Sequence, residues 1–213
     1  MDTDIQQFAT RFNDSLSAAP GAHFWLLRPL LTLLAAGEPV SVDQLATAAG
    51  RGGEEVRQTL ATMSDTEYDS DGRIIGYGIT FNPTPHRYET GDRTFYTWCA
   101  LDTLALPAFL GKTAHVTSPC HGTGEPVRLT VAPDEVTSVE PATAVVSLVT
   151  PDAPTSIRSS FCNQSHFFAG PDAAKDWLAE HPGARILPVA DAYEVGQSVV
   201  EQIVTADTPS GCC

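Results

Sequence analysis

The sequence is poor in basic residues and lacks export and membrane signals. Its 213 residues include 12 Lys and Arg against 26 Asp and Glu, a net charge of −14. A surface this negative repels phosphate backbones, so we expect no nucleic-acid partner. No basic segment followed by an apolar one comes after Met1, and Arg28 and Pro29 interrupt the longest apolar stretch, residues 24–36. We therefore expect no secretory signal, no membrane span and a cytoplasmic location.

The sequence also lacks any C-x-x-C pair, which excludes the usual zinc-knuckle and thioredoxin spacings. An odd number of cysteines without an export signal favours free thiols over a disulfide framework. With 42% hydrophobic residues the chain can build a core without such staples. The five thiols, each to be judged from its own neighbours, are Cys99, Cys120, Cys162, Cys212 and Cys213.

The first third of the chain has the pattern of several short helices. Apolar periodicity predicts helices over residues 5–16 and 24–36. Ser41 and Gln44 form a capping-box pattern that begins a short helix to residue 49. A fourth helix over residues 54–63 and a strand over residues 74–79 complete the outline of a winged helix-turn-helix.

A DNA-reading role for this part is opposed by its charges. The helix in the position of a recognition helix begins Gly53-Glu54-Glu55 and offers only Arg51 and Arg57 as cations. A helix that enters a DNA groove places cationic or amide side chains at its N-terminal end. We therefore favour a helical module that packs on the rest of the chain.

From about residue 80 the pattern changes to short β-like runs and fewer helices. The predicted strands cover residues 86–89, 94–98, 114–117, 127–131 and 143–148, and the predicted helices residues 99–110, 173–180 and 193–204. The fold class is therefore α+β, with a helical winged-helix-like N-terminal part packed on a mostly antiparallel sheet with flanking helices. We expect a helical domain over residues 1–80, a catalytic domain over residues 81–205 and a mobile tail over residues 206–213.

Cys99 and Asp102 lie three residues apart at the start of a predicted helix. This spacing brings the two side chains together on the first turn. The helix N-terminus is expected to lower the pKa of the Cys99 thiol, and Asp102 is placed to accept or return a proton. Alternatively, Cys99 is a small buried apolar residue and Asp102 an acid that favours the helix dipole.

Cys162 lies between aromatic residues and four positions before His166. By itself this segment is typical of a buried strand with a structural cysteine, and a structural thiol is also the default for Cys120. A zinc site of Cys99 and Cys162 with His166 or His121 is conceivable, but the spacing is irregular.

Three blocks in register carry a family resemblance. The blocks are Thr66-Glu67-Tyr68-Asp69 with Ile74-Ile75-Gly76-Tyr77-Gly78, then Tyr96-Thr97-Trp98-Cys99-Ala100-Leu101-Asp102-Thr103-Leu104 with Pro107, and Ser160-Phe161-Cys162 with His166-Phe167-Phe168. In order and in gaps they resemble bacterial organomercurial (alkylmercury) lyases. The resemblance implies that Cys99, Asp102 and Cys162 are catalytic. It also implies a helix-turn-helix part that does not read DNA.

Two features of the sequence affect which of the cysteine sites known in related proteins are expected here. Some members of the family have a second cysteine directly after the third-block one, where this chain has Asn163. The ending Cys212-Cys213 is similar to the paired C-terminal cysteines of mercuric reductases, which implies a site that accepts Hg(II) after cleavage. An untethered tail without a role is the alternative.

The chemistry implied is protonolysis of a carbon–mercury bond. Mercury is a soft cation that selects thiolates, so Cys99 and Cys162 would hold it while Asp102 passes a proton to carbon. We expect Trp98, Tyr96, Phe161 and Phe167 to form a water-poor substrate pocket that favours protonated Asp102. No cofactor is expected; low-molecular-weight thiols or a mercuric reductase would remove the Hg(II). Two rivals stay open: a thiol-based mercury or metal-binding regulator with a helix-turn-helix, and a cysteine hydrolase that uses His166 as its base.

Overall fold

The computed structural model describes residues 3–18, 23–150 and 156–206. Its first part contains the four predicted helices, α1 (Thr3–Ser17), α2 (Phe24–Leu34), α3 (Val42–Ala49) and α4 (Gly53–Thr62). The capping box is confirmed, because the Ser41 hydroxyl accepts the Gln44 N–H and the Gln44 side chain accepts the Ser41 N–H. In the described ranges no helix is both long and apolar enough to cross a membrane.

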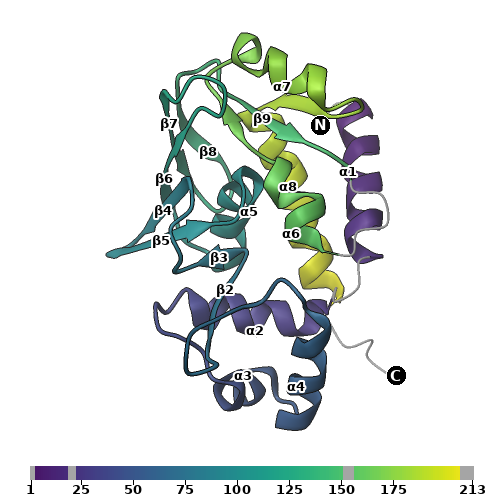
Figure 1. The fold of residues 1–213 in the computed structure, drawn as a ribbon, viewed down its shortest axis with the longest axis vertical. Helices are drawn as coiled ribbons and strands as arrows, with labels where there is room; N and C mark the ends of the chain where they lie inside the picture. Colours follow the sequence, from purple (N-terminus) through teal and green to yellow (C-terminus); the bar gives the residue numbers. More distant parts are fainter. Residues whose placement is uncertain (1–2, 19–22, 151–155, 207–213) are drawn as a thin grey trace.

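A large antiparallel sheet forms one side of the molecule, to the left of α5 and α8 in Figure 1. Within the described residues it has eight strands in the order β1-β2-β3-β5-β4-β6-β7-β8. Their bounds are β1 Glu67–Tyr68, β2 Ile74–Tyr77, β3 Ile79–Thr80, β4 His86–Thr90, β5 Arg93–Thr97, β6 Ala114–Pro119, β7 Pro126–Val131 and β8 Val136–Glu140. The α+β class with a mostly antiparallel sheet is confirmed.

The single strand predicted over residues 74–79 is wrong. The chain reverses at Gly78, whose φ of +70° is in the left-handed region, and β2 pairs with β3 through Tyr77 and Ile79. Glycine is the residue that adopts this conformation without steric cost. The reversal places Gly78 close to Asp102: a Cβ built on Gly78 would lie 3.8 Å from the Asp102 Oδ1.

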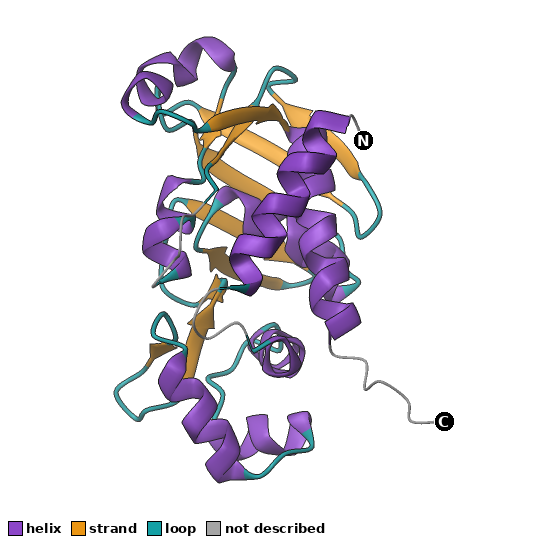
Figure 2. Ribbon diagram, turned by 90° about the vertical axis from the view of Figure 1, so that its right-hand side faces the viewer, coloured by secondary structure: helices purple, strands orange, loops and turns teal. Residues whose placement is uncertain are grey.

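Helix α5 (Ala100–Leu110) is enclosed between the sheet and the long helix α8 (Val189–Ala206) (Figures 1 and 2). Its sequence is apolar on nearly every side, as expected for a helix that is covered all round. Pro107 neither ends nor divides the helix, which continues to Leu110 and stops at Gly111, with φ +65°. Helix α1 packs on the outer side of α8, and α2 contacts α8 as well.

A smaller sheet completes the second half, with the order β10-β9-β11. The remaining elements are β9 Val145–Leu148, α6 Ile157–Ser160, the 3-10 turn η1 Cys162–Gln164, β10 Phe167–Phe168, the 3-10 turn η2 Pro171–Ala174, α7 Lys175–Glu180 and β11 Arg185–Pro188. Strands β1, β8 and β11 and helix α6 were not predicted. The strand expected around Cys162 is wrong, because Cys162 begins the 3-10 turn and only residues 167–168 are in a strand.

Candidate active site

Cys99 is the N-cap residue of α5, directly after Trp98 and strand β5. Its Sγ accepts the N–H of Asp102 at 3.4 Å, and Asp102 Oδ2 accepts the N–H of Cys99 at 3.2 Å. This is a capping box in which a thiol stands where a hydroxyl is usual. The predicted contact between these two side chains is therefore confirmed, and the helix start holds both in fixed positions.

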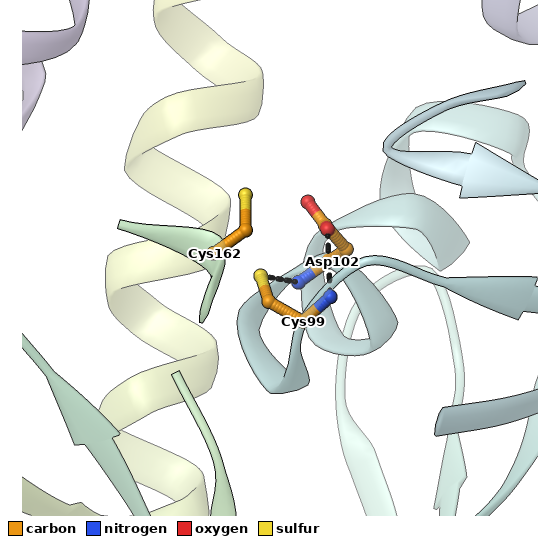
Figure 3. Close-up of side chains that lie close together, drawn as sticks. All are labelled: Cys99, Asp102 and Cys162. Atoms are coloured by element: carbon orange, nitrogen blue, oxygen red, sulfur yellow. Dashed lines mark hydrogen bonds between the residues drawn. The ribbon is translucent and has the colours of Figure 1, made fainter. Parts of the chain in front are cut away.

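Cys162 joins this pair from a distant part of the chain (Figure 3). The two sulfurs and a carboxylate oxygen of Asp102 all lie within 4.8 Å of one another. In Figure 3 the Cys162 side chain lies beside those of Cys99 and Asp102 at the start of α5. Among the described residues, Cys99, Asp102 and Cys162 are the one group of three or more His, Cys, Asp or Glu side chains close enough to share a metal ion.

Ser165 connects the segment of Cys162 to the start of α5 through hydrogen bonds. Its carbonyl accepts the Ala100 N–H at 3.1 Å, and its hydroxyl accepts the Leu101 N–H at 3.3 Å. Its own N–H donates to the Cys162 carbonyl at 3.2 Å. These bonds satisfy N–H groups that a helix start leaves free. The sequence analysis missed this role, since a serine in a loop gives no signal of its partner.

Replacing Ser165 by alanine should impair catalysis more than folding. The Leu101 N–H loses its acceptor, so we expect the free energy of unfolding to fall by about 1–2 kcal/mol. Because Cys162 then shifts relative to Cys99, we expect turnover to fall about tenfold. Chemical denaturation measures the first effect, and hydrocarbon release from an organomercurial, the reaction that the family resemblance implies, measures the second. Ser138→Ala, at an exposed position of β8, is the control. Unchanged turnover in Ser165→Ala would exclude a positioning role of the Ser165 hydroxyl, since the backbone bonds of residue 165 remain in the variant.

Both thiols are held in their protonated form. Burial, a hydrogen bond with Cys162 and the nearby Asp102 charge raise the pKa of Cys99 well above its usual value. The hydrogen bond from Cys99 lowers the pKa of Cys162, but burial and the Asp102 charge outweigh it and the pKa is raised. The expectation that the helix N-terminus lowers the pKa of Cys99 is therefore wrong. A single N–H contact does not offset the loss of water around a buried thiolate.

Asp102 has a pKa raised to about 6 because burial penalises the carboxylate. The hydrogen bonds from the Cys99 side chain and backbone and the Arg158 charge act in the opposite direction. A carboxyl group with this pKa can exist in both protonation states near neutral pH. The expected shift of Asp102 towards its protonated form is confirmed in direction.

An apolar cavity of about 150 Å³ lies beside the cluster and is lined by both Cys162 and Asp102. Of the aromatic residues expected to form a pocket, the described lining includes Phe161 but not Tyr96, Trp98 or Phe167. Helices α1, α2 and α8, which are distant in sequence from Cys99 and from Cys162, contribute part of the cavity wall. Its lining comes from residues of α1, α2, α5 and α8 and from Tyr77, Gly78, Ile157, Phe161 and Cys162.

Trp98 does not line the cavity and belongs to a polar network with Glu67 and Arg158. Its Nε1 donates to Glu67 at 3.1 Å, and the Arg158 guanidinium lies 4.9 Å from the centre of its ring. Arg158 also forms an ion pair with Glu67, and Tyr77 packs against the Trp98 ring at 5.1 Å. The network joins the N-terminal part to helix α6, which precedes Cys162 by one turn.

Other candidate ligands lie outside the cluster or outside the described residues. His121 and His166 stack on each other at 3.9 Å and neither belongs to the Cys99 group, so the hypothesis of a zinc site shared with these histidines is wrong. Cys120 is buried, and its Sγ accepts the Ala169 N–H at 3.2 Å, which suits a structural thiol. Cys212 and Cys213 lie outside the described residues.

Comparisons with known proteins agree with one another. The family model described as alkylmercury lyase matches residues 79–201, and that of the helix-turn-helix domain of alkylmercury lyase matches residues 7–78. Alkylmercury lyase of Streptomyces lividans is 61% identical, with 100% of each chain covered. That of Staphylococcus epidermidis is 49% identical over 99% of this chain and 98% of the relative, and that of Bacillus cereus 46% over 100% and 99%.

The fold has a counterpart among solved structures. A crystal structure of the mercury-bound form of MerB2 aligns with a TM-score of 0.80 at 24% identity, over 93% of this chain and 99% of the other. Fold and site together define an enzyme with paired thiols and a carboxylate, a ligand set that suits a soft metal centre. The chain belongs to the alkylmercury lyase family. The alternative of a thiol-based regulator is not favoured, since the relatives named above are lyases.

Proposed function

We propose that Cys99, Asp102 and Cys162 are the catalytic residues of this alkylmercury lyase and that they cleave a carbon–mercury bond by protonolysis. The observation that carries the proposal is the buried cluster in which two sulfurs and a carboxylate oxygen lie within 4.8 Å of one another. One mercury atom can contact both sulfurs there, and the carbon bound to it then lies within reach of Asp102. Soft thiolate ligands are the ones that mercury selects.

In the first step the substrate enters as a thiol adduct, R–Hg–SR′. The Cys99 thiol gives its proton to the Asp102 carboxylate, and its sulfur bonds to mercury as R′S⁻ leaves. The Cys99 sulfur and a carboxylate oxygen of Asp102 lie within 4.8 Å of each other, and each accepts the backbone N–H of the other residue, which supports this transfer. Because the pKa of the Cys99 thiol is high, the proton leaves as the mercury–sulfur bond forms rather than before it.

In the second step Cys162 adds to the mercury, and its proton goes to the displaced R′S⁻. The second sulfur increases the electron density on the carbon. Protonated Asp102 then gives its proton to this carbon, which keeps the electron pair of the carbon–mercury bond and leaves as R–H. The balance is R–Hg–SR′ plus two thiols giving R–H, R′SH and Hg(II) on two sulfurs. No oxidant or reductant takes part.

The pH dependence of the reaction should report the state of Asp102. The carboxyl must be ionised to accept the Cys99 proton, and its pKa is about 6 rather than the usual 3.8. We expect kcat/KM to be level above pH 7 and to fall about tenfold for each pH unit below about 6. Gas chromatography of benzene released from phenylmercury, in excess thiol under anaerobic conditions, gives the profile. A constant kcat/KM down to pH 4.5 would contradict the role.

The same experiment needs a check of folding at low pH. Burial lowers the pKa of His86 to about 3, below the usual value of 6.5. The unfolded chain therefore binds this proton more readily, and stability present above pH 6.5 is lost as the pH falls towards 3. Circular dichroism at each pH separates this loss from the titration of Asp102.

We also propose a partner set and a division of the chain. The two family matches meet at residues 78 and 79, which supports a helical domain to residue 80 and a catalytic domain over residues 81–205.

In α4, Arg57 pairs with Glu54 and Asp43, and the neighbouring Arg51 pairs with Glu55, which supports the absence of a nucleic-acid partner. Retention of the protein on DNA at low salt would contradict it. Low-molecular-weight thiols or a mercuric reductase remove the Hg(II); the cytoplasmic location stays a prediction.

A further inference from the structure

Glu67 of β1 has a carboxylate that is bonded to three separate parts of the chain. It accepts hydrogen bonds from the Thr80 hydroxyl and from the Asn82 side chain, the latter at 2.9 Å. It also accepts the Trp98 Nε1–H at 3.1 Å and forms an ion pair with Arg158. The Glu67 side chain is only 12% exposed. A carboxylate that is largely buried needs such partners, and in return it holds each of them in a defined position.

Two of these partners adjoin the two thiols. Trp98 directly precedes Cys99. Arg158 belongs to α6, the one-turn helix that comes before Cys162. The contacts of Ser165 fix the chain after Cys162, and those of Arg158 fix it before. A single carboxylate is therefore bonded to both segments that bring the sulfurs together.

Asp65 gives helix α6 a second anchor to the same part of the chain. Its two carboxylate oxygens accept the Ser156 hydroxyl at 2.6 Å and the Arg158 N–H at 3.1 Å, at the start of the helix. A helix of four residues has little stability of its own, so its position depends on such contacts. Asp65 and Glu67 lie within residues 7–78, which match the helix-turn-helix model. The N-terminal part of the chain thus fixes the segment that leads into Cys162.

Gly76 of β2 leaves the space that the Glu67 carboxylate occupies. A Cβ built on Gly76 would collide with this carboxylate and would lie 2.7 Å from the Thr80 Oγ1. Gly76 is not one of the glycines with positive φ, so its backbone conformation does not require glycine. The close approach of the carboxylate does require it. The sheet is therefore shaped to admit Glu67.

We propose that Glu67, supported by Asp65, is a positioning residue that sets the distance between the Cys99 and Cys162 sulfurs. Cys99 is also fixed by its own capping box with Asp102, so loss of the Glu67 contacts releases mainly the Cys162 side. The substrate then still bonds to Cys99, but the second sulfur no longer lies where it can add to the same mercury. The proposal rests on the proposed function, in which one mercury atom contacts both sulfurs.

Glu67→Gln tests the proposal, and Glu89→Gln is its matched control. The amide keeps the size of the side chain but loses the ion pair with Arg158. Glu89 is likewise a partly buried carboxylate paired with an arginine, Arg87 of β4, which adjoins neither thiol in sequence. In Glu67→Gln we expect kcat for phenylmercury in excess thiol to fall about 30-fold and KM to stay within about threefold, because only the second sulfur is misplaced. Glu89→Gln should match the wild type.

Native mass spectrometry of the Hg(II) complexes reports the sulfur spacing without turnover. Hg(II) is added as its complex with two glutathione molecules, to proteins that carry Cys212→Ser and Cys213→Ser so that these thiols do not bind it. Mercury held by both Cys99 and Cys162 releases both glutathiones, whereas mercury held by one thiol keeps a glutathione as its second ligand. We expect protein plus Hg(II) alone for the wild type, and an added mass of one glutathione for Glu67→Gln.

The outcomes distinguish this proposal from the proposed function. Mercury free of glutathione in folded Glu67→Gln, as judged by circular dichroism, would overturn the positioning role. If Glu67→Gln does not fold, Asp65→Ala takes its place, since it removes both anchors of α6 but keeps the Glu67 network, and the same glutathione adduct is expected. Should the wild type release no hydrocarbon, the catalytic proposal fails, while the mass spectra still decide whether Glu67 sets the spacing.

Discussion

Asp102→Asn should bind Hg(II) nearly as well as the wild type and release hydrocarbon about 1,000-fold more slowly. The amide has the shape of the carboxyl, and its oxygen can still accept the Cys99 N–H, so the start of α5 is kept. An amide neither accepts the thiol proton nor holds one for the carbon, which removes the proton transfer itself. Gas chromatography of the hydrocarbon and retention of Hg(II) after gel filtration measure the two properties.

Asp92→Asn is the matched control for this change, because Asp92 is an exposed carboxylate in the turn between β4 and β5. It should leave both properties unchanged. Two results would contradict the role of Asp102. Near-normal hydrocarbon release by Asp102→Asn would show that another group carries the proton, and loss of Hg(II) retention would show that the carboxylate serves mainly to hold the metal.

Cys99→Ser and Cys162→Ser should each abolish turnover, with a loss of about 1,000-fold or more. A hydroxyl is a hard, weakly acidic group that does not replace a thiolate on mercury. Cys99→Ser is especially informative, since serine is among the preferred N-cap residues and should keep or improve the start of α5. Loss of activity in this variant would therefore not result from loss of folding.

Cys120→Ser is the control for both cysteine variants. Cys120 is as buried as the other two but lies outside the metal-binding group, and a hydroxyl can accept the Ala169 N–H in its place. We expect full turnover. Hydrocarbon release by Cys162→Ser at the wild-type rate would reduce the proposed site to Cys99 and Asp102 alone.

The parts of the site that the sequence predicted are those fixed by local geometry. Cys99 and Asp102 are three residues apart at a helix start, where the spacing alone brings their side chains together. Ser41 and Gln44 form their capping box for the same reason. Such contacts depend on backbone conformation within one turn, so residue type and spacing suffice to predict them.

The wrong predictions concern surroundings rather than spacing. The pKa of Cys99 is raised, although a helix N-terminus acting alone would lower it, because the core that covers it comes from other segments. The aromatic residues adjacent to the thiols were expected to form the pocket, yet only Phe161 of them lines it, and helices α1, α2, α5 and α8 supply most of the wall. Neither burial nor pocket walls can be read from neighbours in sequence.

The sequence by itself determined the α+β class, the helices apart from α6, the pairing of Cys99 with Asp102 and, through the family blocks, the likeness to alkylmercury lyases. Only the tertiary structure decided that Cys162 meets this pair, that both thiols stay protonated, and that an apolar cavity adjoins Asp102. The physical reason is that helix starts and strand patterns follow from short-range sterics and hydrogen bonding. Desolvation and long-range contacts, such as those of Ser165 with α5, exist only once distant segments have packed.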